Sequence, residues 1–146
     1  KISILGVIKM KKIDQAINKS DKEVYLIGEV SESEIKDAEN DLGFEMTSEM
    51  KSYFKKYGAI SVGHIEIFGL GVNKDSYMNI VISSKKIFDD RFLKKEYLVI
   101  ENLGDGHYAI YNDSGIFEYA NGNVVEKLSN DLEEYIKDRI IAANKI

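Results

Sequence analysis

The spacing of apolar residues changes near Lys95, and this change restricts the fold more than any other feature of the sequence. Before Lys95, apolar residues recur mainly at intervals of three and four, which predicts amphipathic helices. After Lys95 they alternate with polar residues, which predicts strands, until a helical spacing returns close to the C-terminus. Helices, then strands, then one last helix are typical of an α+β fold in which helices pack against an antiparallel sheet.

The helices are predicted from their start and stop signals. Ser31 and Glu34 form an S-x-x-E capping box, and Gly43 supplies a left-handed stop for the same helix. Asp75 is the expected N-cap of a later helix. We predict helices over residues 11–18, 31–42, 50–57, 75–88 and 130–143. The second and third are expected to form a helical hairpin, because only a short connection separates them.

The strands are predicted from short alternating segments bounded by turn residues. Residues 24–27 are extended in character, and residues 62–70 alternate like a strand. Glycine-containing turns then join a four-stranded antiparallel meander, which we expect over residues 97–103, 107–112, 116–120 and 123–127. Asn130 and Glu133 form a second capping box, which begins the closing helix.

The length of 146 residues is that of one ordinary domain. The chain contains no proline, internal repeat or low-complexity stretch at which a linker could be placed. We therefore expect a single domain over residues 10–146, preceded by an N-terminal extension, residues 1–9, whose structure the sequence does not define. No apolar run approaches the roughly 20 residues that span a bilayer, so we expect no membrane partner.

Residues suited to catalysis are scarce. The chain has no cysteine, which removes thiolate nucleophiles and thiolate metal sites and fits the reducing cytosol where we expect the protein. We interpret His64 as a solvated strand residue and His107 as the first residue of a strand, rather than as bases or ligands. Glu39 lies beside a buried helix face and is expected to anchor the helix edge. We predict no catalytic residue, cofactor or metal.

Charge is distributed unevenly along the chain. Residues 29–49 contain eight acids and one lysine, a local net of −7, whereas residues 1–22 carry six lysines and two aspartates, a net of +4. The whole chain has a net charge of −5 and two arginines, which argues against direct binding of nucleic acid. The acidic segment favours a basic partner, although the same charges are also typical of a solvated helix face.

Three groups of residues follow one another in a recognisable order. The first is the acid-rich segment from Val30 to Phe44, which contains Glu39 and Leu42-Gly43. The second is Tyr53-Phe54 with Tyr57-Gly58, and the third is Ile67 to Gly71. Together they resemble the SUKH superfamily over roughly residues 11–142. Members commonly carry Leu-Pro where Met46-Thr47 stands here, but Thr47 can cap the following helix.

The resemblance implies an α+β domain without enzymatic activity that binds another protein. Bacterial members resemble immunity proteins, each of which binds the C-terminal domain of a secreted or contact-delivered toxin, often a nuclease. Fungal relatives regulate cell-wall glucan synthesis through protein contacts. We therefore expect a cytoplasmic immunity protein that occludes the active site of a cognate toxin, with a basic nuclease as the expected toxin. A regulatory scaffold module is the alternative, and a small carboxylate-dependent hydrolase is a third hypothesis.

Partner contacts are expected at exposed positions on the acidic helix and in the turns of the meander. Asp37 and Asp41 lie four residues apart on one helix face, away from the apolar stripe, so a partner can reach them without disturbing the core. The candidate partner-binding residues are Glu34, Asp37, Asp41, Glu45, Asp105, Tyr108 and Asn121.

Overall fold

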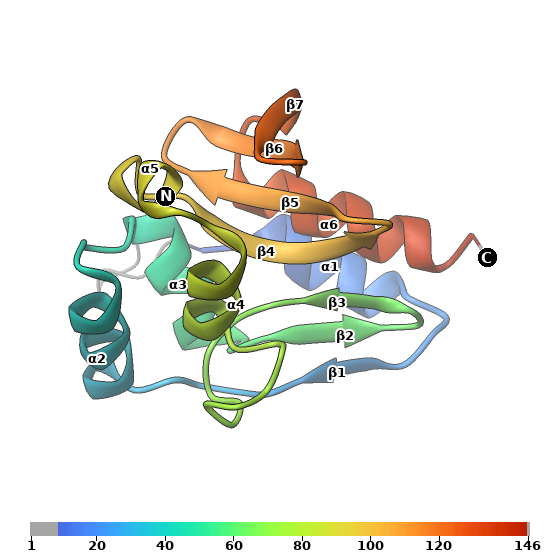
Figure 1. Ribbon diagram of the computed structural model, residues 1–146. Helices are drawn as coiled ribbons and strands as arrows, with labels where there is room; N and C mark the ends of the chain where they lie inside the picture. Colours follow the sequence, from blue (N-terminus) through green and yellow to red (C-terminus); the bar gives the residue numbers. More distant parts are fainter. Residues whose placement is uncertain (1–8, 146) are drawn as a thin grey trace.

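The computed structural model describes residues 9–145, which form two sheets surrounded by helices (Figure 1). Its helices are α1 (Lys11–Lys19), α2 (Glu32–Leu42), α3 (Ser48–Lys56), α4 (Ile80–Ile87), α5 (Asp90–Lys94) and α6 (Leu132–Ala143). Its strands are β1 (Val24–Leu26), β2 (Ile60–Val62), β3 (Ile65–Ile67), β4 (Leu98–Gly104), β5 (His107–Asn112), β6 (Gly115–Ala120) and β7 (Asn123–Ser129). Residues 1–8, most of the expected N-terminal extension, lie outside the described residues.

The strands form two antiparallel sheets, in the orders β1-β2-β3 and β4-β5-β6-β7. The second sheet is the predicted meander, because each strand pairs with the next one along the chain. The sheets meet where the backbone N–H of Phe68, just after β3, donates to the carbonyl of Ile100 on β4 at 2.8 Å. The prediction of an α+β fold with an antiparallel meander is confirmed.

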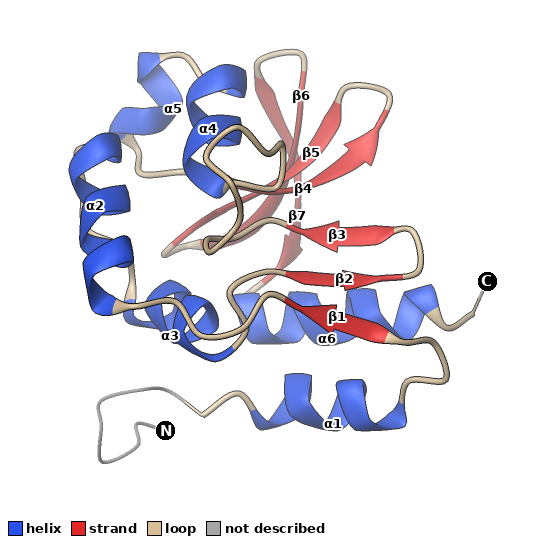
Figure 2. Ribbon diagram, turned by 90° about the horizontal axis from the view of Figure 1, so that it is seen from below, coloured by secondary structure: helices blue, strands red, loops and turns tan. Residues whose placement is uncertain are grey.

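Helices cover both faces of the second sheet (Figures 1 and 2). On one face, Phe88 and Phe92 from the α4–α5 region pack edge-on against Tyr119 of β6, with ring centroids 5.4 and 4.9 Å away. On the other face, Tyr135 and Arg139 of α6 bind Glu101 of β4. Strand alternation places these contacts on opposite sides of the sheet. Burial on both faces explains why the inner strands are rich in fully buried apolar residues.

Side-chain caps and a left-handed glycine set the bounds of α2 and α3 as predicted. Ser31 Oγ accepts a hydrogen bond from the N–H of Glu34 at 3.1 Å, and Gly43 ends α2 with φ of 85°. Thr47 Oγ1 accepts from the N–H of Met50 at 3.1 Å, so it caps α3 without a proline at the helix start. The two helices contact each other, but in Figure 2 they run in different directions and do not lie side by side as the expected hairpin.

The predicted helix over residues 75–88 begins later than expected. Asp75 does not cap it, because its own N–H donates to Asn73 Oδ1 at 2.8 Å within a turn. The cap is Asn79, whose Oδ1 accepts from the N–H groups of Val81 and Ile82 at 3.0 and 3.2 Å. Asn79 therefore accepts hydrogen bonds from two of the backbone N–H groups that a helix leaves unpaired at its N-terminus. The helix starts after Asn79 and not after Asp75 for this reason.

Two further predictions need correction, and one helix was not predicted. The expected strand over residues 62–70 is a hairpin of β2 and β3, because Gly63, with φ of 58°, turns the chain; His64 therefore lies in a turn. The short helix α5 was not predicted. The closing helix is capped by Asp131, which accepts from the N–H of Glu134 at 2.8 Å, rather than by Asn130. Asp131 fits the same capping chemistry one residue later.

Candidate partner-binding surface

Three of the predicted partner-binding residues line one cleft between α2 and α4. Glu34, Asp37 and Asp41 form its acidic wall, since they lie three and four residues apart on one side of α2. The cleft has a volume of about 190 Å³. We call it the α2 cleft. Glu45 is exposed in the connection after α2 and does not line it.

The opposite wall of the α2 cleft is mostly apolar. It is built by the segment that leaves β3 and by the first turn of α4 (Figure 2). Leu70 and Val81 are buried, whereas Ile82 is 37% exposed. Residues lining this wall are Leu70, Gly71, Val72, Lys74, Asn79, Val81 and Ile82. A cleft with carboxylates on one side and apolar groups on the other can hold a basic, partly apolar segment.

Close backbone packing places this apolar wall. The N–H of Leu70 donates to the carbonyl of Gly58 at 3.0 Å, and a Cβ on Gly69 would lie 1.7 Å from the same oxygen. Gly71 has φ of 84°, and a Cβ there would lie 2.8 Å from the side chain of Ile27. Only glycine fits both positions. Two of the glycine motifs of the sequence therefore meet in space and fix the loop that faces α2.

The carboxylates of the α2 cleft differ from the other acids of α2 in their partners. Glu32 pairs with Lys55 at 2.9 Å, and this lysine lowers the pKa of the Glu32 carboxyl. Within the described residues, Asp37 and Asp41 form no ion pair. Lys74 lines the opposite wall of the same cleft but forms no ion pair with them, so both aspartates are available to a cation on a partner.

The predicted residues of the meander turns lie elsewhere. Asp105 is exposed in the turn between β4 and β5, and Asn121 is exposed in the turn between β6 and β7; both have φ of 54°. Tyr108 is partly buried and packs against the core. None of the three lines the α2 cleft. The structure therefore divides the seven predicted residues and brings together only Glu34, Asp37 and Asp41.

The carboxylates buried in the described part of the chain bind groups of the chain itself. Glu39, 7% exposed, accepts from the N–H of Met46 at 2.7 Å and lies 3.6 Å from Lys51 Nζ. It therefore anchors the end of α2, as predicted. Glu101, 3% exposed, receives two hydrogen bonds from Arg139 at 2.9 and 2.7 Å and one from Tyr135 at 2.6 Å.

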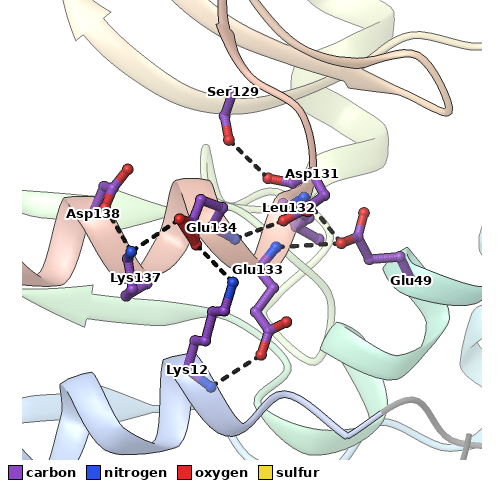
Figure 3. A network of polar contacts seen from close by, with 9 residues as sticks. All are labelled: Lys12, Glu49, Ser129, Asp131, Leu132, Glu133, Glu134, Lys137 and Asp138. Carbon is purple, nitrogen blue, oxygen red and sulfur yellow. Dashed lines mark hydrogen bonds and ion pairs between the residues drawn. The ribbon is translucent and has the colours of Figure 1, made fainter. Parts of the chain in front are cut away.

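Glu49 on α3 holds the N-terminus of α6 (Figure 3). Its Oε2 accepts from the N–H groups of Leu132 and Glu133 at 3.0 and 3.3 Å, and its Oε1 accepts from the Tyr111 hydroxyl at 3.2 Å. Burial raises the pKa of the Glu49 carboxyl, although the two backbone donors act in the opposite direction. This carboxylate caps a helix from another element rather than facing a cleft.

Comparison with known families agrees with this arrangement. A family model described as SUKH_5, SMI1-KNR4 cell-wall, matches residues 10–141. The chain belongs to the SUKH superfamily. Among curated proteins, no significant match to this SUKH chain is found.

The histidines of this SUKH protein lie apart from the α2 cleft. His107 Nδ1 lies 2.5 Å from Glu118 Oε2 on the neighbouring strand, and His64 is exposed in the β2–β3 turn. Within residues 9–145, no cluster of three acidic or histidine side chains is suited to hold a metal ion. No helix in the same range is long and apolar enough to cross a bilayer.

The sequence analysis of this SUKH chain missed the apolar half of the cleft. Ile82 lies within the helix that the sequence predicts over residues 75–88, and Val72 lies outside every predicted helix and strand. The double acceptance by Asn79 shows where α4 starts, and with that start Ile82 falls in the first turn, facing α2. An asparagine three residues before Ile82 is the signal that could have located it.

Proposed function

We propose that this SUKH protein is an immunity protein that binds the toxic domain of a cognate toxin and blocks its active site. The α2 cleft is the proposed contact surface, and the observation that carries the proposal is its unpaired carboxylates beside an apolar wall. Superfamily membership supports a role in protein interaction.

The chemistry of the α2 cleft favours a basic partner. Asp37 and Asp41 can each accept hydrogen bonds from a lysine or arginine, and charge-assisted bonds of this kind are stronger than neutral ones. Val72 and Ile82 offer apolar surface beside them, so an apolar side chain of the partner can be anchored there while a neighbouring lysine or arginine pairs with the aspartates. This combination gives both orientation and affinity.

A nuclease domain is the proposed class of toxin. Such a domain presents basic groups to the phosphates of its substrate, and an acidic surface can occupy the same groups. Electrostatic attraction also speeds the encounter of two proteins of opposite charge. The net charge of −5 and the aspartates of α2 that form no ion pair both favour a fast encounter with a basic domain.

A role in binding rather than catalysis is part of the proposal. Glu39, Glu49 and Glu101 are engaged with backbone N–H groups or with Arg139, which supports a structural use for each. A general acid or base needs contact with a substrate, and these three groups already contact the chain. The exposed acids of the α2 cleft are suited to binding a partner protein.

The test is protection of cells that express the toxin domain encoded next to this gene. Co-expression of the wild-type chain should restore growth, and the purified chain should inhibit the toxin stoichiometrically. Asp37→Lys with Asp41→Lys should reduce protection. The matched control is Asp113→Lys with Glu126→Lys, which changes the net charge equally at exposed positions outside the cleft.

The outcome also separates the proposal from the scaffold alternative. Loss of protection in the α2 variant but not in the control supports an immunity role at the α2 cleft. No inhibition of the neighbouring toxin domain by the wild-type chain would contradict that role and leave the regulatory scaffold as the better hypothesis.

A further inference from the structure

Helices α1 and α6 run side by side (Figures 1 and 2). Residues of both helices line a second concave surface. Lys12 near the start of α1 contacts Glu133 and Glu134 near the start of α6, and Ser20 after α1 contacts Asn144 after α6. The two helices therefore run in the same direction. The groove between them has a volume of about 300 Å³.

Lysines line both walls of this α1–α6 groove. Lys12 and Lys19 belong to α1, and Lys137 and Lys145 belong to α6 or follow it directly. This positive surface is notable in a chain with a net charge of −5. Its four lysines come from opposite ends of the sequence, so only the fold gathers them.

One carboxylate of the chain already shows how the two walls bind an anion. Glu134 lies 3.3 Å from Lys12 Nζ and 3.0 Å from Lys137 Nζ, so it bridges the two helices (Figure 3). Within the described residues, Lys19 and Lys145, farther along the groove, form no ion pair. The groove is thus neutralised near its first end and positively charged near its second.

Apolar surface lies between the lysines. Ile141 of α6 is 43% exposed, and the small side chain of Ala16 on α1 lets a partner approach the backbone closely. An exposed isoleucine flanked by cations is complementary to a segment that presents an apolar residue between acids. A simple inorganic anion would leave this apolar surface in water.

We propose that the α1–α6 groove binds an acidic amphipathic helix of a partner protein. Two parallel helices leave between them a furrow that a third helix can fill with its apolar face. Lys12 and Lys19 lie seven residues apart, about 10 Å along α1 at 1.5 Å per residue. Lys12 pairs with Glu134 only at the exposed surface, and such a pair contributes little, so Lys12 can also contact an acid of the bound helix. Acidic residues two turns apart on the bound helix match this spacing, with an apolar residue between them against Ile141. This groove does not depend on the function of the α2 cleft.

The test uses a fluorescein-labelled peptide of about 15 residues, close to the length at which an isolated helix becomes stable. It carries glutamates about two helical turns apart, with leucines between them on one face and alanines elsewhere. Fluorescence anisotropy with the whole protein should show saturable binding. A peptide of the same design with glutamine for glutamate, which keeps the apolar face and removes the charge, should bind at least about tenfold more weakly.

Three variants separate binding in the groove from general charge attraction. Lys19→Glu with Lys145→Glu should weaken peptide binding by at least about tenfold, whereas Lys85→Glu with Lys86→Glu on α4, which changes the net charge equally, should alter it less than about threefold. Ile141→Ser keeps every lysine and should still weaken binding by about threefold or more, because it removes apolar contact. The substituted side chains are all exposed, so the variants should retain the wild-type melting temperature.

Specific results would overturn the proposal. These are no saturable binding, equal loss in both charge-reversal variants, or no effect of Ile141→Ser. Sedimentation with phosphatidylserine vesicles tests the other acidic surface that a lysine groove could meet. Vesicle binding that requires Lys19 and Lys145, without binding of the peptide, would identify a membrane surface as the ligand and contradict the proposed helix.

Discussion

The acidic residues around α6 and those exposed on α2 carry the same chemical group but have different roles. Glu101, beside α6, is 3% exposed and is held by Arg139 and Tyr135. Asp37 and Asp41 line the α2 cleft and form no ion pair within residues 9–145. The α6 region uses carboxylates to join distant elements, whereas the α2 cleft leaves them for a partner.

This comparison shows that burial and partners, rather than the number of acids, decide the role of a carboxylate. A buried charge is costly unless it is paired, so its partner becomes part of the fold. An exposed charge contributes little to stability but acts at longer range on association. Substitutions in the two regions should therefore separate stability from binding.

The largest effect on stability is expected for Arg139→Met. This change leaves the Glu101 carboxylate buried without its cation, which should reduce the free energy of unfolding by about 3–5 kcal/mol. Urea denaturation followed by circular dichroism measures the loss. The double variant Arg139→Met with Glu101→Leu removes both charges and should recover part of the loss, because only the Tyr135 hydroxyl is then left without its partner. No recovery would show that the ion pair is not the cause.

A smaller loss is expected for Glu39→Leu. The N–H of Met46 would then be buried without an acceptor, which should cost about 1–3 kcal/mol. Glu39→Gln is the matched control, since its amide oxygen can still accept that bond, and it should lose less. Equal losses for the two variants in the same denaturation experiment would mean that the bond to Met46 contributes little.

Glu49 should give stability a pH dependence. Burial raises the pKa of this carboxyl above its ordinary value of 4.5, so the folded protein holds the proton to higher pH than the unfolded chain. The free energy of unfolding should fall as pH rises from the ordinary value through the folded pKa. Glu49→Gln should lack this contribution, so its stability relative to wild type should increase over that window. Parallel stability curves across this pH range would contradict the prediction.

The smallest effect on stability is expected in the α2 cleft. Asp37→Lys with Asp41→Lys changes only exposed side chains and should alter the free energy of unfolding by no more than about 0.5 kcal/mol. Thermal melts of this variant and of the Asp113→Lys with Glu126→Lys control should agree with wild type. A large loss in the α2 variant alone would mean that these aspartates stabilise the fold.

Local patterns were sufficient to predict α2, α3 and the meander. The Ser31 cap and the Gly43 stop act between residues that are close in sequence, and turns that need positive φ, such as the one at Gly104 to Gly106, mark the hairpins. The first sheet could not be predicted in the same way. Its strands have three residues each, too few for alternation to show, and their pairing depends on residues far apart in the chain.

The candidate surface was predicted in part for a similar reason. The aspartates of α2 share one helix face, which the spacing alone indicates. The apolar wall depends on how the loop after β3 packs against Gly58, and Glu49 caps a helix 83 residues farther along the chain. Contacts of this kind arise from the tertiary fold and leave no local pattern.

The central claim is that the α2 cleft receives a basic toxin domain, and association kinetics test it most directly. Stopped-flow mixing with the neighbouring gene's toxin domain, at low and at moderate salt, measures the association rate of the wild-type chain, the Asp37→Lys with Asp41→Lys variant and the Asp113→Lys with Glu126→Lys control. The α2 variant should associate at least about tenfold more slowly than the control at low salt, with a weaker salt dependence. Equal association rates for the α2 variant and the control would contradict the claim.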